Sequence, residues 1–540
     1  MTDESFNRNP ILTIRVFLSV FILSLLAPLC NGTAVTIGPE FQVNTYTNNS
    51  QSLPSVAGLS GGGFVVTWQS FGQDGSNAGV YGQLFESGGN KVGSEFQVNT
   101  NTNDYQGSPS AAGLSDGGFI VTWQSFGQDG SGDGVYGQLF DGSGNKVGSE
   151  FQVNTCTNNG QRTPFVAGLS GGGFVVTWES NLQDGSYFGI YGQLFDRFGN
   201  KVGNEFQVNT FTYNSELRSS VASLSNGGFV VVWESLVFTG EYANIFAQLF
   251  AGSGGKVGSE FQVNTYTNDS QKYPSVAGLS SGGFVVTWAS MHQDGSVNGI
   301  YGQLFDSLGD KVGSEFQVNT YTNDNQMYSS MADLFGGGYV VTWNSSGQDG
   351  SNAGVYGQLF DGSGNEVGGE FQVNTYTNNS QALPSVAGLS GGGFVVTWQS
   401  LDQDGSNAGV YGQLFEIKEG KAMPWIPLLL LDEDKRNVWT GPAGFGAFSF
   451  VVNDTGTIIT EITYKFIEFS CGPIIKNGTT TSSGMWLIAD SQFTIERTFD
   501  LNLEITLNGT FDQTGTYASG TYEATSYGEI CSGTWNASPF

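Results

Sequence analysis

Residues 41–95 read FQVNTYTNNSQSLPSVAGLSGGGFVVTWQSFGQDGSNAGVYGQLFESGGNKVGSE, and at Phe96 the same phrase begins again. Its opening motif, FQVNT, recurs with a constant step of 55 residues, at Phe41, Phe96, Phe151, Phe206, Phe261, Phe316 and Phe371. The tryptophan near the middle of the phrase keeps the same step, from Trp68 to Trp398. Seven copies of one fixed period indicate a solenoid, a propeller or another repeat array.

Each copy contains four runs that are typical of short β-strands. In the first copy they are SVAGL, GGFVVTWQS, GVYGQLFE and KVGSEFQVN, and Gly, Asn, Asp and Ser separate them. Phe64, Val66 and Trp68 alternate with Val65 and Thr67, which is the period of a strand. Four strands repeated seven times predict an all-β fold, a seven-bladed β-propeller of four-stranded blades.

The ends of the array favour a closed ring. The last copy stops at residues 411–416 and lacks its KVGSEFQVN strand, whereas residues 35–44 (VTIGPEFQVN) supply such a strand ahead of the first copy. We therefore expect the N-terminal strand to complete the last blade. The alternative is an open solenoid, which would need a polar cap at each end.

The small side chains of SVAGL predict that this run is the innermost strand, where the blades crowd together. The bulky FVVTW and VYGQLF runs fit the wider middle of the blade. We expect Trp68 and its six equivalents to pack between blades, because large aromatic side chains dominate core energetics. The alternative is an exposed stack of tryptophans that binds sugars.

Composition narrows the class of partner. The chain has 540 residues, a formal net charge of −30 and 81 glycines, and 14% of its residues are aromatic. Because the aromatic residues stand at fixed positions, the glycines indicate tight turns rather than disorder. A negative field of this size repels phosphates and anionic membrane surfaces, so we expect no nucleic acid partner.

Residues 1–34 have the pattern of a secretory signal. Arg8 and Arg15 precede an apolar run that is too short for an ordinary membrane span. Residues 32–34 (Gly-Thr-Ala) offer a small-residue cleavage site. The sequence thus predicts a secreted or cell-surface protein with no membrane span in the mature chain, and the alternatives are a lipid anchor at Cys30 or an uncleaved anchor.

Three further parts follow. The propeller is predicted at residues 35–416, a linker at 417–437, and a separate β-domain, a sandwich or a barrel, at 438–540. Cys471 and Cys531 are the only cysteines of that last domain. In an exported protein they are expected to form a disulfide.

The polar loops predict one ligand-binding face. In a four-stranded antiparallel blade, the second-to-third loop and the blade-to-blade loop share a face, and rigid scaffolds carry function on such loops. The second-to-third loops repeat an aspartate and the blade-to-blade loops repeat a glutamine. The candidate ligand-binding residues are therefore Asp74, Asp129, Asp184, Asp294, Asp349, Asp404, Gln51, Gln106, Gln161, Gln271, Gln326 and Gln381. Asp-Gly is also a common turn pair, and Ca²⁺ bound through aspartate and backbone oxygens is a further alternative.

Four motifs of the copies, FQVNT, GGFVVTW, QDGS and YGQLFD, together resemble a repeat that is common in secreted bacterial proteins, some of which also carry RTX calcium-binding segments. The resemblance covers residues 38–416 and implies an extracellular or surface location rather than a particular activity. The glycine-rich nonapeptide of RTX repeats is missing from the sequence. The end of the chain, GTFDQTGTYASGTYEATSYGEICSGTWNAS, resembles a C-terminal β module of secreted bacterial proteins.

Motifs for common catalytic sites are missing from the sequence. The one histidine, His292, lies in a loop, where we expect a solvated side chain rather than a member of a catalytic triad. The fourth copy departs most from the repeat, with Thr239 in place of the aspartate and Glu216 in place of the glutamine. A catalytic pocket would therefore be sought near Glu216, Arg218 and Glu241.

Two classes of function follow from these observations. Near-identical blades favour a non-enzymatic binding or adhesion protein, because several similar loops give multivalent recognition of an extracellular carbohydrate or protein. The alternative is a secreted glycan-active hydrolase with a pocket at the propeller axis, which would need a pair of carboxylates. Acidic side chains gathered at the axial mouth would favour the enzyme.

Overall fold

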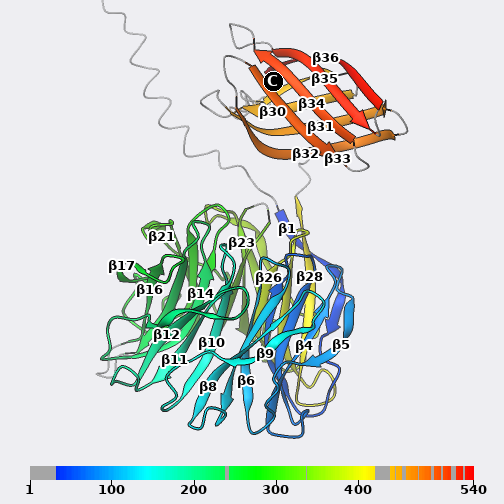
Figure 1. Ribbon diagram of the computed structural model, residues 1–540. Helices are drawn as coiled ribbons and strands as arrows, with labels where there is room; N and C mark the ends of the chain where they lie inside the picture. Colours follow the sequence, from blue (N-terminus) through cyan, green and yellow to red (C-terminus); the bar gives the residue numbers. More distant parts are fainter. Residues whose placement is uncertain are drawn as a thin grey trace, which may run out of the picture. The chain divides into compact units, whose positions relative to one another are not determined.

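The computed structural model forms two compact units, residues 1–422 and residues 423–540 (Figure 1). The described residues are 32–236, 242–335, 337–419, 438–443, 446–452, 458–471, 474–487, 492–499, 503–511, 518–526 and 529–539. The predicted signal sequence, apart from its last three residues, and the predicted linker after residue 419 lie outside them.

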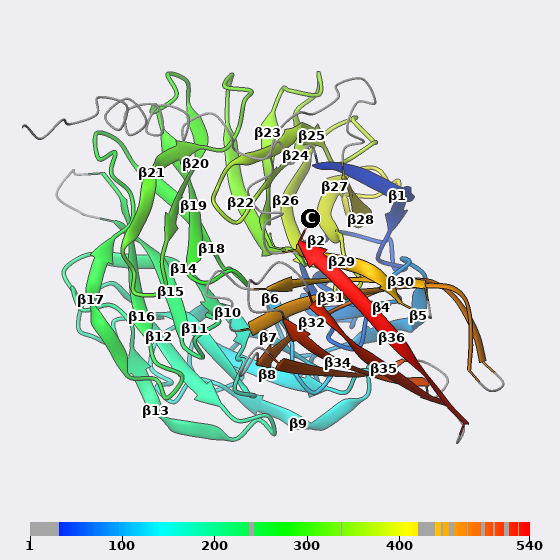
Figure 2. The same cartoon turned by 90° about the horizontal axis from the view of Figure 1, so that it is seen from above.

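The first unit is a seven-bladed β-propeller, as the repeat predicts, and each blade is one four-stranded antiparallel sheet. The innermost strands are β2 (Gln51–Gly58), β6 (Gln106–Gly113), β10 (Gln161–Gly168), β14 (Ser215–Ser223), β18 (Gln271–Gly278), β22 (Gln326–Asp333) and β26 (Gln381–Gly388). Figure 2 shows these seven strands around the common axis. We number the blades one to seven in this order.

The other three strands of each blade follow outward from the axis. The second strands are β3 (Phe64–Phe71), β7 (Phe119–Phe126), β11 (Phe174–Asn181), β15 (Phe229–Leu236), β19 (Phe284–Met291), β23 (Tyr339–Ser346) and β27 (Phe394–Leu401). The third strands are β4 (Ala78–Phe85), β8 (Asp133–Phe140), β12 (Phe188–Phe195), β16 (Asn244–Phe250), β20 (Asn298–Phe305), β24 (Ala353–Phe360) and β28 (Ala408–Glu419). The outer strands are β5 (Lys91–Gln97), β9 (Lys146–Gln152), β13 (Lys201–Gln207), β17 (Lys256–Gln262), β21 (Lys311–Gln317), β25 (Glu366–Gln372) and β1 (Gly32–Gln42).

Ring closure by the N-terminal strand is confirmed. The last blade has the strand order β1-β28-β27-β26, and Val35 pairs with Glu416. Each blade also contributes one glutamate of the outer strand that accepts the backbone N–H of a threonine in the preceding blade-to-blade loop. At the closing junction Glu40 accepts from Thr375 at 2.7 Å and from Gln403 at 2.6 Å. The closing blade therefore makes the same lateral contact as the blades that the chain connects covalently.

The tryptophans pack between blades, as predicted. Trp68 is fully buried and belongs to a core cluster with Val395 and Leu414 of the adjacent blade, and its six equivalents are at most 1% exposed. The sugar-stacking alternative for these tryptophans is therefore wrong. The burial also explains why the tryptophan is the same in all seven copies, since each one fills space that two blades share.

One glycine in the innermost strand marks where the blades come closest. A Cβ atom at Gly58 would lie 2.4 Å from the carbonyl oxygen of Gly388 on the next strand. The equivalent position is glycine in five blades and is Ser223 or Asp333 in the other two. The innermost strands thus converge at this end and leave room for side chains only toward their opposite ends.

The second unit is an antiparallel sheet with the strand order β32-β31-β30-β29-β36-β35-β34-β33. Its strands are β29 (Val438–Ala443), β30 (Gly446–Val452), β31 (Ile458–Cys471), β32 (Ile474–Leu487), β33 (Gln492–Phe499), β34 (Leu503–Phe511), β35 (Ala518–Ser526) and β36 (Glu529–Pro539). The side chains of Cys471 and Cys531 lie outside the described part, so their disulfide stays a prediction. In the portion of the chain that the structure describes, no helix has the length and hydropathy that crossing a bilayer requires.

Candidate functional site

A shared irregularity at the start of each innermost strand shapes the mouth of the axis. In all seven blades the pairing of the first two strands shifts register at this point, as between Ser52 and Ser55. One residue near the start of each innermost strand, the fourth in β14 and the third in the other six, adopts a left-handed backbone with φ between 51° and 57°. These residues are Leu53, Ser108, Thr163, Arg218, Tyr273, Tyr328 and Leu383. The left-handed conformation costs a non-glycine residue about 1 kcal/mol. Each blade therefore has a strained backbone at this position, and such strain is typical of binding sites.

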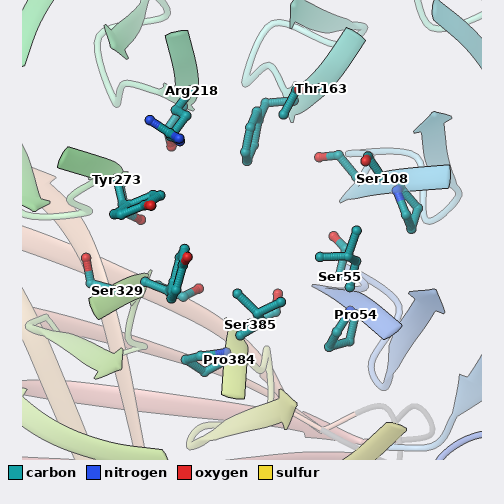
Figure 3. A pocket seen from close by; sticks show the side chains of 18 of the residues that line it. Pro54, Ser55, Ser108, Thr163, Arg218, Tyr273, Ser329, Pro384 and Ser385 are labelled. Carbon is teal, nitrogen blue, oxygen red and sulfur yellow. The ribbon is translucent and has the colours of Figure 1, made fainter. Parts of the chain in front are cut away.

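These seven left-handed residues line a cavity of about 570 Å³ on the axis, which we call the axial pocket. The residues that follow them complete the wall, chiefly a repeated Pro-Ser pair such as Pro54 and Ser55. Figure 3 shows Arg218 and Tyr273 as neighbours on one wall, with Ser108 and Pro54 across the cavity. The scaffold is sevenfold, but the side chains that it presents are not.

The polar wall of the axial pocket comes from blades four, five and six. Arg218 Nη1 donates to Glu234 Oε2 at 2.8 Å, and the guanidinium lies 4.5 Å from the centroid of the Tyr273 ring. The Tyr273 and Tyr328 rings are 4.4 Å apart. Burial, together with the neighbouring phenol, raises the pKa of Tyr328 to about 12, so this hydroxyl stays neutral at physiological pH.

Two glutamates pair with Arg218, which lines the pocket, and with Arg162, which precedes the lining residue Thr163. Glu234 is only 2% exposed at its side chain, and Glu179 is 4% exposed and bonds Arg162 Nε at 3.0 Å. Glu179 also accepts the Arg218 N–H at 2.7 Å. In blade two the same position is Gln124, which accepts the equivalent N–H of Thr163 at 3.0 Å. Blades three and four have thus exchanged a structural amide for a carboxylate, and each carboxylate has gained an arginine partner.

The charges at the axial pocket balance locally. Arg162 and Arg218 are each paired with one buried carboxylate. Among the described residues, no Asp or Glu lines the cavity itself. A charged ligand would therefore find no unpaired opposite charge in the wall, whereas a neutral ligand finds hydroxyls, guanidinium N–H groups and aromatic faces.

The six predicted glutamines lie beneath the loop face. Gln51 is fully buried, donates to Asn48 O at 2.9 Å and accepts from Asn44 Nδ2 at 3.3 Å. The other five, Gln106, Gln161, Gln271, Gln326 and Gln381, are equally buried. In this conformation their side chains join the loop to the blade, and their role in ligand contact stays a prediction.

The six predicted aspartates have internal partners as well. Oδ1 of Asp74 accepts the Ser76 N–H at 3.0 Å, and the same turn contact recurs at Asp129, Asp184, Asp294, Asp349 and Asp404. The second oxygen accepts from a glutamine of the outer strand in two blades, as where Gln207 Nε2 donates to Asp184 Oδ2 at 3.1 Å, and it is buried without a partner at Asp74, Asp129, Asp294 and Asp349. Among the described residues, no three Asp, Glu, His or Cys side chains are grouped so that they would hold a metal ion, and calcium binding stays a prediction.

Replacing these aspartates should separate the turn role from the ligand role. We expect Asp74→Asn to cost about 1 kcal/mol of stability, because the turn keeps a weaker neutral acceptor, and we expect losses at several blades to add. Binding per folded molecule should not change. Thermal melts with and without chelator, together with binding titrations, check this. Loss of binding by a folded multiple variant, or a lower Tm in chelator, would restore the ligand or calcium role.

The two described residues of blade four that the sequence suggested for a catalytic pocket do not lie in one site. Arg218 lines the axial pocket, but Glu216 is 1% exposed and lies under the loop. Thr239 and Glu241 fall outside the described residues. His292 is half-exposed, with Nδ1 3.5 Å from Asp269 Oδ2, as expected of a loop histidine.

The pocket residues themselves were largely missed by the sequence reasoning. The left-handed bulge leaves no mark in the sequence, because none of the seven residues that adopt it is a glycine. The available signal was variation: this position reads Leu, Ser, Thr, Arg, Tyr, Tyr and Leu, and the position before it varies as well, while the rest of the strand changes less. In a repeat protein, a variable position inside a constant strand indicates a position that faces something other than the next blade.

Comparisons with known proteins give likenesses of fold. No family model and no curated protein matches the sequence. A crystal structure of a protein of unknown function from Dyadobacter fermentans is 10% identical, with a TM-score of 0.46, over 73% of this chain and 100% of that chain. The α-L-arabinofuranosidase of Fusarium graminearum, solved with arabinobiose, is 12% identical with a TM-score of 0.41, over 57% and 92%. The α-L-arabinanase of Penicillium chrysogenum, also solved with arabinobiose, is 16% identical with a TM-score of 0.39, over 56% and 92%. All three TM-scores are below 0.5, and no family is identified for the chain.

Proposed function

We propose that this protein is an exported carbohydrate-binding protein whose axial pocket holds a neutral sugar. The observation that carries the proposal is the asymmetric wall of Arg218, Tyr273 and Tyr328 on an otherwise sevenfold scaffold. Sugars present apolar ring faces that stack on aromatic rings and hydroxyls that need directed partners. The wall supplies both, and the serines of the other blades add further hydroxyls.

The proposed site differs from the multivalent loop face that the repeats suggest. The repeated aspartates and glutamines bond within and between blades, which is a task that every blade shares. Recognition of one ligand requires groups that differ around the axis. The axial pocket meets that requirement, since its left-handed position carries a polar or aromatic side chain in blades two to six and leucine in blades one and seven.

Hydrolysis of the bound sugar is the second candidate function, and Glu179 and Glu234 favour it. Burial raises the pKa of Glu234, and the Arg218 guanidinium offsets this only in part. A raised pKa suits a general acid, but glycoside hydrolysis needs two carboxylates that flank the scissile bond. Because both glutamates stand behind the pocket wall, binding is the better supported function.

The chain itself supplies replacements that test the axial pocket. Leu53 and Leu383 hold the same left-handed position as Tyr273, so Tyr273→Leu keeps a side chain that the bulge tolerates. The double variant Arg218→Leu with Glu234→Gln restores the pattern of blade one and leaves no buried charge unpaired. We expect about a tenfold loss of affinity for Tyr273→Leu and a larger loss for the double variant.

The measurement is a titration of neutral polysaccharides (cellulose, xylan, mannan and arabinan) and their fragments, beside a reducing-sugar assay on the same panel. Phe198→Ser is the matched control. This exposed aromatic lies in a turn on the opposite face, and blade two has Ser143 at its position. Unchanged affinity in both pocket variants would contradict sugar binding in the axial pocket. Sugar release that is abolished by Glu234→Gln would establish hydrolysis instead of binding alone.

A further inference from the structure

One blade-to-blade segment of the loop face carries exposed aromatic side chains. Phe211 and Tyr213 lie between β13 and β14 and are 59% and 88% exposed. Tyr187 of blade three and Tyr242 of blade four, at equivalent positions of the repeat, are 51% and 46% exposed. We call these four residues the aromatic sector.

Three of the four sector residues, Tyr187, Tyr213 and Tyr242, stand at positions that are aromatic only in blades three and four, whereas the position of Phe211 is tyrosine in four other copies. The position of Tyr213 is asparagine in every other copy: Asn48, Asn103, Asn158, Asn268, Asn323 and Asn378. The position of Tyr187 and Tyr242 is Asn77, Gly132, Val297, Asn352 and Asn407 elsewhere. A change of polar side chains into exposed aromatic ones in a single region is unfavourable for solubility, and such a patch is typical of an interaction site.

The sector is continuous along the chain with the axial pocket. The segment that carries Phe211 and Tyr213 begins after Gln207 on the outer strand and enters the innermost strand at Ser215. It therefore runs radially, from the rim of the propeller toward the axis. Further along the same stretch of chain, Arg218 lines the axial pocket.

Hydrogen bonds at both ends hold this segment in place. Asn209 Nδ2 donates to the carbonyl oxygen of Phe211 at 2.8 Å, and the Thr210 N–H donates to Glu260 Oε2 at 2.5 Å. At the inner end, Asn214 Nδ2 donates to Ser235 Oγ at 3.0 Å. A fixed backbone presents the two rings without a large ordering cost on binding.

The blade-three loop lies against the same segment. In blade two, a Cβ atom at Gly132 would be 3.2 Å from the carbonyl oxygen of Asn159. Tyr187 and Asn214 hold the corresponding positions one copy later. From this repeat equivalence we infer that Tyr187 lies beside the radial segment and adds to its exposed aromatic surface.

We propose that a neutral polysaccharide chain binds along the aromatic sector while one of its sugars occupies the axial pocket. The proposal rests on the proposed function and adds the class of ligand, a polymer rather than a free sugar. Tyr213 and Arg218 are five residues apart, and the strand that begins at Ser215 carries the chain inward between them, a distance on the order of 10 Å. One sugar does not reach both, so a ligand that contacts both is a chain of several sugars. The net charge of −30 opposes an anionic chain.

The test compares ligand lengths in variants built from the repeat itself. Phe211→Asn with Tyr213→Asn installs the residues of blade two, Asn101 and Asn103, on the same backbone. For the polysaccharide that binds the wild-type protein, we expect the double variant to lose about tenfold or more in affinity for the hexasaccharide. Its affinity for the monosaccharide and disaccharide should be unchanged. Phe198→Ser, on the opposite face, should leave every affinity as it is.

Each outcome decides between the two proposals. Equal affinities of the wild-type protein and the sector variant at every length overturn the inference and leave the axial pocket intact. An equal loss at all lengths also overturns it, because the change then acts through the fold. If Tyr273→Leu leaves all affinities unchanged, the proposal that the axial pocket binds a sugar is contradicted. The proposal that a polysaccharide extends from this pocket is then contradicted as well. A change of oligomeric state in the sector variant, seen by sedimentation, would show a contact between copies instead.

Discussion

Removing residues 32–42 should open the propeller and lower its stability more than any single substitution. This segment is β1, the outer strand of the last blade, and it pairs with β28 along its length, from Gly32 with Glu419 to Gln42 with Tyr411. Its loss leaves one edge of β28 without partners and removes the Glu40 contacts to Thr375 and Gln403. We expect a cost of at least about 5 kcal/mol, a large share of typical domain stability, and a fall in Tm on the order of 10 °C or more.

A peptide added in trans provides the control for this deletion. A synthetic peptide of residues 32–44 should restore the Tm of the deleted protein in a concentration-dependent manner, since it binds the folded state only. A peptide with Phe41→Asp should not, because the Phe41 ring packs against Phe85 at 5.4 Å between centroids. A deletion variant that melts like the full chain would contradict closure by this strand.

The fold was predictable because several independent features of the sequence indicate the same blade and recur in every copy. The strand alternation of FVVTW, the turn residues between runs and the constant step all indicate one blade, and the missing last strand indicates how the ring closes. The structure adds to this picture the lateral contact from the outer-strand glutamate to the preceding loop, as from Glu95 to the Thr45 N–H at 2.6 Å. That contact joins residues 50 positions apart and gives no local signal.

The site was predicted less well for a physical reason. The sequence reasoning selected the polar residues that repeat, such as Asp74 and Gln51, and these have protein partners in every blade where they occur. The axial pocket is built where the repeat varies, at the left-handed residue of the innermost strand. Arg218 was singled out correctly because it departs from the repeat. Tyr273 and Tyr328 were missed because the sequence shows that this position varies but does not show that it faces the axis.

Blade four also differs from the repeat at Glu216. This residue does not line the axial pocket, and we expect it to lower the stability of the folded protein. Its carboxyl takes the place of the amide that Gln51 and its equivalents bury in the other blades. Only Oε1 has a partner, the Ser235 hydroxyl at 3.1 Å, and Oε2 is buried without one. Burial raises the pKa of Glu216 to about 8, and the nearby carboxylates of Glu260 and Asp184 add to this.

Glu216→Gln should therefore stabilise the protein in a pH-dependent manner. The unfolded chain loses the Glu216 proton near its ordinary pKa of 4.5, whereas the folded protein keeps it up to about pH 8. Between these values the unfolded state is progressively favoured, by about 1.4 kcal/mol per pH unit. The variant removes this loss, so its advantage should grow from pH 4.5 to pH 8, reach a few kcal/mol and then stay constant.

The reverse change provides the matched control for that titration. Gln106→Glu places the same carboxyl in blade two, where the amide accepts from Asn99 Nδ2 at 3.2 Å and is fully buried. Since the surroundings are those of the repeat, this variant should acquire the pH dependence that Glu216→Gln loses, and it should be destabilised most above pH 8. The measurement is the free energy of unfolding in denaturant at a series of pH values. A difference between the wild-type protein and Glu216→Gln that does not change with pH would mean that Glu216 is ionised in the folded state, because only a proton held there and lost on unfolding links stability to pH in this range.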